Sequence, residues 1–116
     1  MNSQVAEALM FANERRCALA EIRARIQALP FEDGCELVAS ILDQPEGHEE
    51  AFPVGRMLLS VHRFGEQALS TALREAGVLT ADKKVRQLTE RQRRALALVL
   101  RTRAATYRRG PRGSGA

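Results

Sequence analysis

Basic residues crowd the last third of this chain of 116 residues. Six of them form the first candidate site: Lys83, Lys84, Arg86, Arg91, Arg93 and Arg94. Lys and Arg side chains neutralise the phosphates of nucleic acids, and arginine can also hold a phosphate through two parallel hydrogen bonds. The residue types therefore indicate binding of a polyanion rather than catalysis.

A turn over residues 61–65 is the second candidate, because it joins two short segments of helical length. A tight turn through Gly65 into a helix start leaves backbone amides unpaired, and the helix dipole adds partial positive charge there. Arg63 and Phe64 directly precede this glycine. We therefore predict that Arg63, Phe64 and Gly65 contribute to the same phosphate-binding site.

Little in the sequence could carry out catalysis. A nucleophilic triad needs a Ser or Cys near an oriented His, but no GxSxG-type motif surrounds any candidate, and no GxxxxGKS/T or GxGxxG phosphate loop occurs. Cys17 and Cys35, with His48 and His62, are too few for a zinc site or a disulfide framework. We expect no enzyme activity, no metal and no cofactor, two buried thiols and two surface histidines.

The net charge of +4 is the remainder of two opposed parts. Residues 1–82 hold 7 Arg against 13 Asp or Glu, a net charge of −6. Residues 83–116 hold 11 Lys or Arg against Glu90 alone, a net charge of +10. A concentrated positive field attracts polyanions, so nucleic acid is the expected partner. Neither a membrane span nor a signal peptide is recognisable, which indicates a cytoplasmic protein.

The elements that must position these residues are helices. The first is expected from Asn2 or Ser3 to Leu29, since Pro30 cannot continue it. Its apolar residues recur every three or four positions and should cover the core: Val5, Leu9, Ala12, Leu19, Ile22, Ile26 and Leu29. The opposite face should carry the charges Glu14, Arg15, Glu21 and Arg25.

A second, short helix is expected to begin near Asp33, which can cap it, and to end before Pro45. Residues 44–51 are acidic and predict a mobile surface loop. A third helix should open at Pro53, a residue favoured at the first helical position, and end before Gly65.

A fourth helix after Gly65 should stop at Gly77 in a left-handed conformation. Residues 78–88 lack a clear period and predict an irregular basic connection. Thr89 should cap the last helix, with Gln92 completing a capping box.

No segment alternates apolar and polar residues as a strand would, so the fold class is all-α, with four to five helices. The N-terminal region, residues 1–52, and the region of residues 53–108 are expected to share one compact domain. Residues 109–116 predict a disordered basic tail.

The segment from Pro53 to Leu100 resembles the helix-two-turns-helix core of the actinobacterial integration host factor family, which is related to a domain of ribosomal protein S13. The matching residues are Met57-Leu58, Gly65, Lys83-Lys84-Val85-Arg86 and the heptapeptide from Glu90 to Leu96. The layout of the N-terminal region is also similar. The chain is thus a candidate divergent member, with Glu66 at a position where the family's turn carries a basic residue.

The resemblance implies a nucleoid-associated protein that binds and bends duplex DNA with little sequence preference and assists integrase-type recombination or gene regulation. It implies DNA contacts from the turn and from the basic stretch, with an integrase complex as a further partner. Either Arg63 supplies the positive charge of the turn, or binding has shifted to the C-terminal arginines.

Two other functions stay open. An S13-like RNA-binding module is the nearest, although few aromatic residues are present to stack single-stranded bases. The second is a protein-interaction module in which the first helix docks a partner or another copy through Leu19, Ile22, Ile26 and Leu29. Since so short a chain needs its apolar faces for its own core, we expect a monomer in the absence of DNA.

Overall fold

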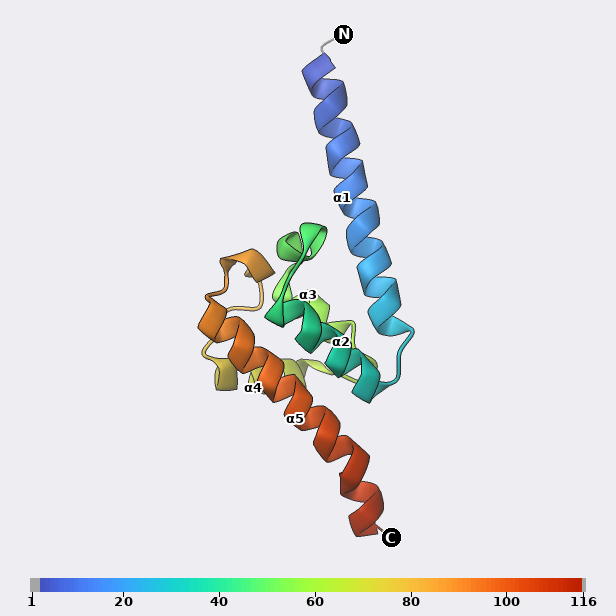
Figure 1. The fold of residues 1–116 in the computed structure, drawn as a ribbon, viewed down its shortest axis with the longest axis vertical. Coiled ribbons are helices and arrows are strands. Elements are labelled where there is room, and N and C mark those ends of the chain that lie inside the picture. Colours follow the sequence, from blue (N-terminus) through green and yellow to red (C-terminus); the bar gives the residue numbers. More distant parts are fainter. Residues whose placement is uncertain (1–2, 116) are drawn as a thin grey trace.

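Five α-helices and two 3-10 helices make up the described part of the chain (Figure 1). The structure is a computed structural model that describes residues 3–115, with side chains for residues 5–107. In order, the elements are α1 (Ser3–Gln27), α2 (Phe31–Asp43), η1 (Gly47–Ala51), α3 (Val54–Leu59), α4 (Glu66–Ala76), η2 (Val85–Gln87) and α5 (Glu90–Gly115). The predicted all-α class, with a long N-terminal helix, is confirmed.

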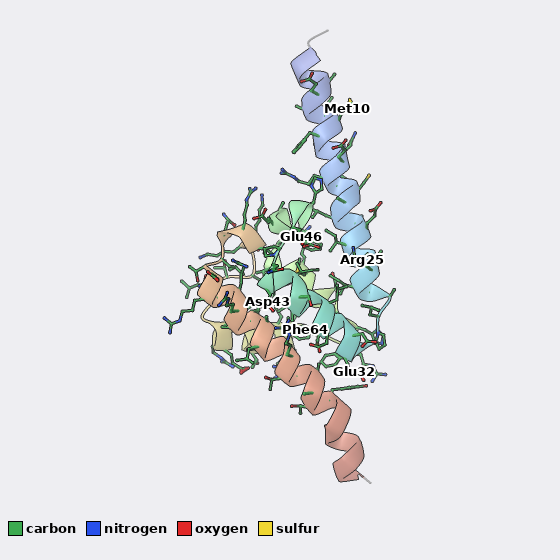
Figure 2. The ribbon with its side chains drawn as sticks, in the orientation of Figure 1. Met10, Arg25, Glu32, Asp43, Glu46 and Phe64 are labelled. Carbon is green, nitrogen blue, oxygen red and sulfur yellow. The ribbon has the colours of Figure 1, made fainter. Side chains whose placement is uncertain are left out.

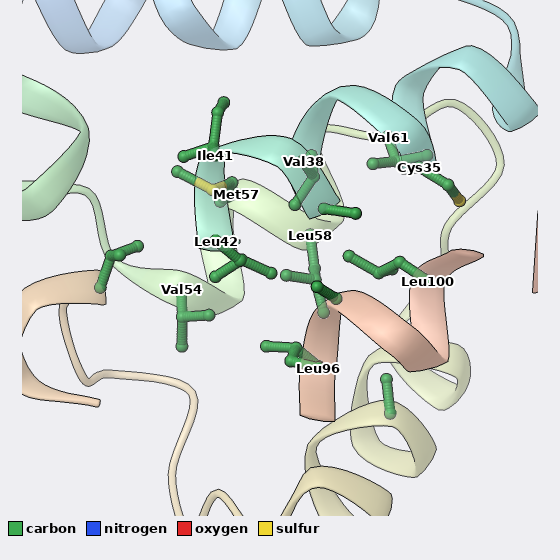
Figure 3. Packing of buried hydrophobic residues seen from close by; sticks show 14 of the residues in the cluster. Cys35, Val38, Ile41, Leu42, Val54, Met57, Leu58, Val61, Leu96 and Leu100 are labelled. Atoms are coloured by element: carbon green, nitrogen blue, oxygen red, sulfur yellow. The ribbon is translucent and has the colours of Figure 1, made fainter. Parts of the chain in front are cut away.

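The core lies between α2 and α5, with α3 and α4 completing it (Figures 1 and 3). Its largest fully buried side chains include Val38 and Leu42 of α2 and Leu96 and Leu100 of α5. Each such side chain contributes about 1.5–3 kcal/mol of burial free energy. Because the buried residues come from both 1–52 and 53–108, the two regions share one hydrophobic core.

Only the C-terminal half of α1 reaches this core. Ile22 and Ile26 are buried and Leu19 is half-buried, as predicted. Val5 and Leu9 are exposed, so the expectation that the whole apolar stripe covers the core was wrong for its N-terminal part. The reason is geometric, because α1 extends past the body of a molecule 67 Å long (Figure 1).

Some helix boundaries differ from the sequence prediction. The helix α2 begins two residues earlier, because the carbonyl of Pro30 already accepts the Gly34 amide at 2.8 Å, and Asp33 lies within the first turn instead of capping it. The acidic linker contains the 3-10 helix η1 in place of an irregular loop, with the Glu46 amide donating to Glu49 Oε1 at 2.8 Å. Pro53 is the N-cap of α3, which ends at Leu59.

The ends of α4 and α5 agree with the prediction. Gly77 terminates α4 in the left-handed region, with φ of 75°. Thr89 and Gln92 form the predicted capping box: the Thr89 amide donates to Gln92 Oε1 and the Gln92 amide donates to Thr89 Oγ1, both at 3.0 Å. Gln92 Nε2 also donates to the Gly77 carbonyl at 2.9 Å, which joins the end of α4 to the start of α5.

The predicted disordered tail, residues 109–116, follows Tyr107, the last residue with a described side chain. The described backbone continues α5 to Gly115, and nothing of Ala116 is described. The tail therefore stays a prediction. None of the described helices has an apolar stretch long enough to cross a membrane.

Candidate nucleic-acid interface

Two backbone hydrogen bonds tie the segment before α5 to the start of α3. The amide of Val54 donates to the carbonyl oxygen of Lys83 at 2.8 Å, and the amide of Val85 donates to that of Phe52 at 3.0 Å. The Val85 side chain is fully buried. The basic connection that the sequence predicts is thus irregular, but its backbone is fixed and continues into η2.

A close approach at Gly55 holds the same segment. The Gly55 amide donates to the Ala81 carbonyl at 3.0 Å. A Cβ added to Gly55 would lie 2.6 Å from Ala81 Cβ and 2.9 Å from its carbonyl oxygen, closer than real atoms pack. Only glycine lets these two segments meet. Sequence reasoning missed this role, because the contact joins residues 26 positions apart.

Four cations gather where this segment meets α5, and they are called the basic cluster: Lys83, Lys84, Arg86 and Arg91. The two arginines are exposed and the two lysines are half-buried. Within the described part of the chain, none of the four forms an ion pair. Figure 1 shows this segment and the first turn of α5 on the same side of the body of the molecule. The four cations therefore lie close together in the chain on a backbone held by hydrogen bonds, with the acids Asp82 and Glu90 as their neighbours in sequence.

The structure adds Arg15 of α1, which sequence reasoning did not connect with this site. Arg15 and Arg86 line one surface depression together with Glu50. The Arg15 guanidinium lies 5.2 Å from the centroid of the Phe11 ring, in cation–π geometry. The expectation that Arg15 occupies the face opposite Ile22 was wrong, because residues seven apart lie two turns apart on the same face of a helix.

Two arginines of the predicted site are engaged within the fold. The Arg93 guanidinium donates to the Leu42 carbonyl at 2.8 Å and lies 3.4 Å from that of Asp43, so it caps the C-terminus of α2. We therefore withdraw Arg93 from the interface. Arg94 pairs with Glu90 at 2.6 Å. This pair is largely exposed and therefore weak, so Arg94 stays available to a phosphate.

The turn between α3 and α4 differs from the prediction in the backbone conformation of its glycine and in the burial of its aromatic side chain. Arg63, with φ of 66°, takes the left-handed conformation, whereas Gly65 is extended, with φ of −88°, and caps α4. Phe64 is 4% exposed and packs in the core, which removes it from any DNA contact. Of the three predicted turn residues, only Arg63 presents a charged side chain at the surface.

The helix α5 separates this turn from the basic cluster. The Arg103 guanidinium lies 5.7 Å from the centroid of the Phe64 ring, so the turn packs near the middle of α5 (Figure 2). Arg91 and Arg103 are twelve positions apart, which corresponds to about 18 Å of helix rise. Beside the turn, Glu66 and Asp82 line a depression and make it less positive. The structure therefore does not unite the predicted constellation, and its positive part lies at the start of α5.

The remaining reactive groups do not form a site in the described residues. Cys35 is buried, and its burial raises the pKa of its thiol to about 12, so it stays protonated. Cys17 is exposed, which corrects the expectation of two buried thiols. His62 is exposed and His48 is half-buried. Within residues 3–115, no three His, Cys, Asp or Glu residues are grouped as a metal site.

No protein-family model, no curated protein and no solved structure matches this chain. The resemblance to a DNA-binding family thus rests on the motif residues alone, and the basic cluster rests on its own contacts.

Proposed function

We propose that this chain binds double-stranded DNA through its phosphates, with the basic cluster and Arg15 as the principal contacts. The observation that supports this proposal is that the cations differ in whether oxygen atoms of the fold already pair with them. Arg93 and Arg101 are held by carbonyl or carboxylate oxygens of α2, whereas the basic cluster has no such partner in the described residues. Surfaces without a polyanionic ligand normally mix charges of both signs.

The surroundings of the cluster favour duplex DNA over a single strand. Proteins that bind single strands stack the bases on exposed aromatic side chains. Here Phe52 and Phe64 are buried, and although Phe11 is 55% exposed, the Arg15 guanidinium lies over its ring, so no row of free aromatic rings is present among the described residues. A rigid helix end that carries cations is suited to phosphates at fixed positions, as on a duplex.

The resemblance supplies the finer part of the proposal. It adds a nucleoid location, bending of the bound DNA and assistance to an integrase complex or to gene regulation. Phosphate contacts alone confer little sequence preference, in agreement with an architectural role. Duplex RNA offers phosphates of the same charge at the different spacing of an A-form helix, so RNA is the competitor that an experiment must exclude.

Fluorescence anisotropy with two unrelated DNA duplexes of equal length, one single strand and one RNA duplex tests the proposal. We expect equal affinity for both DNA duplexes and weaker binding of the other two. Lys84→Glu should weaken binding to both DNA duplexes alike. The matched control is Arg25→Glu, an exposed position on α1 far from the start of α5 (Figure 2), and it should leave the affinity unchanged.

The same experiment can reject the proposal. Absence of duplex DNA binding at low salt would overturn it. Tighter binding to duplex RNA would favour the S13-like alternative. A loss in Lys84→Glu that is confined to one sequence would show that this residue reads bases instead of phosphates.

A further inference from the structure

The outer side of α1 carries exposed apolar side chains that the rest of the described chain leaves largely uncovered. The helix projects beyond the body of the molecule (Figure 1). Met10 is 65% exposed and Leu9 is 60% exposed. Soluble proteins seldom leave large apolar side chains side by side in water without a partner. This part of α1 therefore needs an explanation other than packing within its own domain.

The face opposite Ile22 and Ile26 follows a regular spacing. Its residues alternate by four and three positions: Ala6, Met10, Asn13, Cys17, Ala20 and Ala24, which form the outer stripe. All but the half-buried Ala6 are exposed. Alternating steps of four and three are those of the a and d positions of a coiled coil. The helix thus carries one apolar side for its own core and a second side with coiled-coil spacing.

The two edges of the outer stripe carry opposite charges. Glu7, Glu14 and Glu21 recur every seven residues along one edge, at heptad position e. Arg16 and Arg23 recur at the same interval along the other edge, at position g. None of these five side chains forms an ion pair inside the described chain. Their charges are therefore free to pair across an interface.

We propose that α1 pairs with α1 of a second copy as a parallel, in-register two-stranded coiled coil. In a parallel pair, position g of one helix lies beside position e of the next heptad of the other, so Arg16 meets Glu21 of the second copy, and the contact occurs twice by symmetry. In an antiparallel pair, equivalent edges meet, and Glu would face Glu while Arg faced Arg. The charges therefore favour pairing with a second α1 helix, and they favour the parallel over the antiparallel orientation.

The geometry of the rest of α1 is compatible with this pairing. Because Ile22 and Ile26 attach the helix to its own core, the outer stripe lies on the opposite side of the helix from that core. His48 of η1 borders the stripe, since it lines one depression with Met10, Asn13 and Cys17, and a second helix would pack beside it. From Ala6 to Ala24 the stripe spans about 27 Å of helix. Asn13, at a d position, would lie beside Asn13 of the second copy, where the two amides can hydrogen-bond to each other when the helices are in register. The proposal replaces the expectation of a monomer and does not depend on DNA binding.

Sedimentation equilibrium of the full chain, reduced and without DNA, tests the pairing. We expect a concentration-dependent equilibrium between monomer and dimer. Arg16→Glu and Glu21→Arg should each raise the dimer dissociation constant about tenfold, because each replaces two attractive contacts by repulsive ones. The double exchange Arg16→Glu with Glu21→Arg should restore a value close to that of the native chain.

The matched control is Arg74→Glu on α4, which makes the same charge change at an exposed position outside α1 and should leave the equilibrium unchanged. A monomer at every concentration would overturn the proposal. A dimer that the single exchanges leave unchanged or tighten, or that the double exchange fails to restore, would overturn the parallel arrangement.

Cross-linking with a short bismaleimide tests the register. In the proposed arrangement Cys17 faces Cys17 of the second copy, while Cys35 is buried and protonated. We expect a covalent dimer from the native chain and none from Cys17→Ser. Failure to cross-link in a chain that sediments as a dimer would overturn the in-register pairing.

Discussion

The arginines along α5 fall into two groups that differ in their surroundings. Arg101 pairs with Asp43 at 2.7 Å, Arg93 caps α2, and Arg103 lies over the ring of Phe64. At the start of the same helix, Arg91 has no ion pair in the described chain. The number of arginines in a sequence therefore does not measure the positive charge that a surface offers to a ligand.

The helix α2 causes this difference. Its C-terminus carries partial negative charge from free carbonyls, and Asp43 adds a carboxylate there. The arginines of α5 that face α2 are therefore compensated within the fold. At the start of α5, Glu90 is the nearest acid along the chain, and it is already paired with Arg94. Positive charge is left over where α5 begins, and this is where we propose that DNA binds.

The largest effect should come from reversing two charges of the basic cluster. Lys84→Glu combined with Arg91→Glu removes two phosphate contacts and adds two repulsions, so we expect duplex affinity to fall about a hundredfold, or about 2.7 kcal/mol. Anisotropy titration at constant salt measures this loss. If the variant bound DNA as tightly as the native chain, the two groups of cations would not differ in function.

Removal of the Arg93 side chain should lower the stability of the fold and leave DNA affinity nearly unchanged. Arg93→Ala leaves the α2 carbonyls without their charged donor, which should cost about 2 kcal/mol of unfolding free energy. Urea unfolding measures the loss, and DNA affinity measured under fully folded conditions should stay within about threefold. A large loss of affinity without a loss of stability would return Arg93 to the interface.

A smaller effect is expected where the basic segment meets α3. Gly55→Ala forces Ala81 away and should cost about 1–2 kcal/mol of stability, and it should weaken DNA binding without removing a charge. Gly65→Ala is the matched control, because a Cβ there meets nothing within 4 Å and the backbone is extended. Equal stability of the two variants would contradict the close approach at Gly55.

The smallest effect should come from the turn. Because Glu66 stands where the turn of the family that this chain resembles carries a basic residue, the resemblance implies that Glu66→Lys tightens DNA binding. Since the turn packs against the middle of α5, about 18 Å from Arg91, we now expect a gain of less than about threefold, from long-range attraction alone. A gain of tenfold or more would place the turn on the DNA and would join the two regions that the structure separates.

Local signals in the sequence predicted the fold well. The left-handed stop at Gly77 and the capping box of Thr89 and Gln92 depend on residues close together in the chain, and both are confirmed. Contacts between distant residues could not be predicted in this way. The α2 partner of Arg93 lies some fifty residues away, and Arg15 and Arg86 line one depression only because α1 packs beside η1.

For the two faces of α1, too, the sequence could not predict the contacts with distant residues. Its apolar residues recur at helical spacing, but the spacing does not say which of them reach the core. Ile22 and Ile26 do so, whereas Leu9 and Met10 lie beyond the body. The charges along the edges of the outer stripe are visible in the sequence. The sequence does not say that they lie beside an exposed face of the helix, which the exposure of Met10 and Cys17 shows.

If the unpaired cations at the start of α5 and Arg15 bind phosphates, the affinity for duplex DNA must fall steeply as the salt concentration rises. Five such contacts should give a slope of log K against log salt of about −4.5, and Lys84→Glu with Arg91→Glu should reduce it to about −2.7. Arg93→Ala should leave the slope unchanged. A native slope near −1, or the same slope in the double variant as in the native chain, would contradict the account.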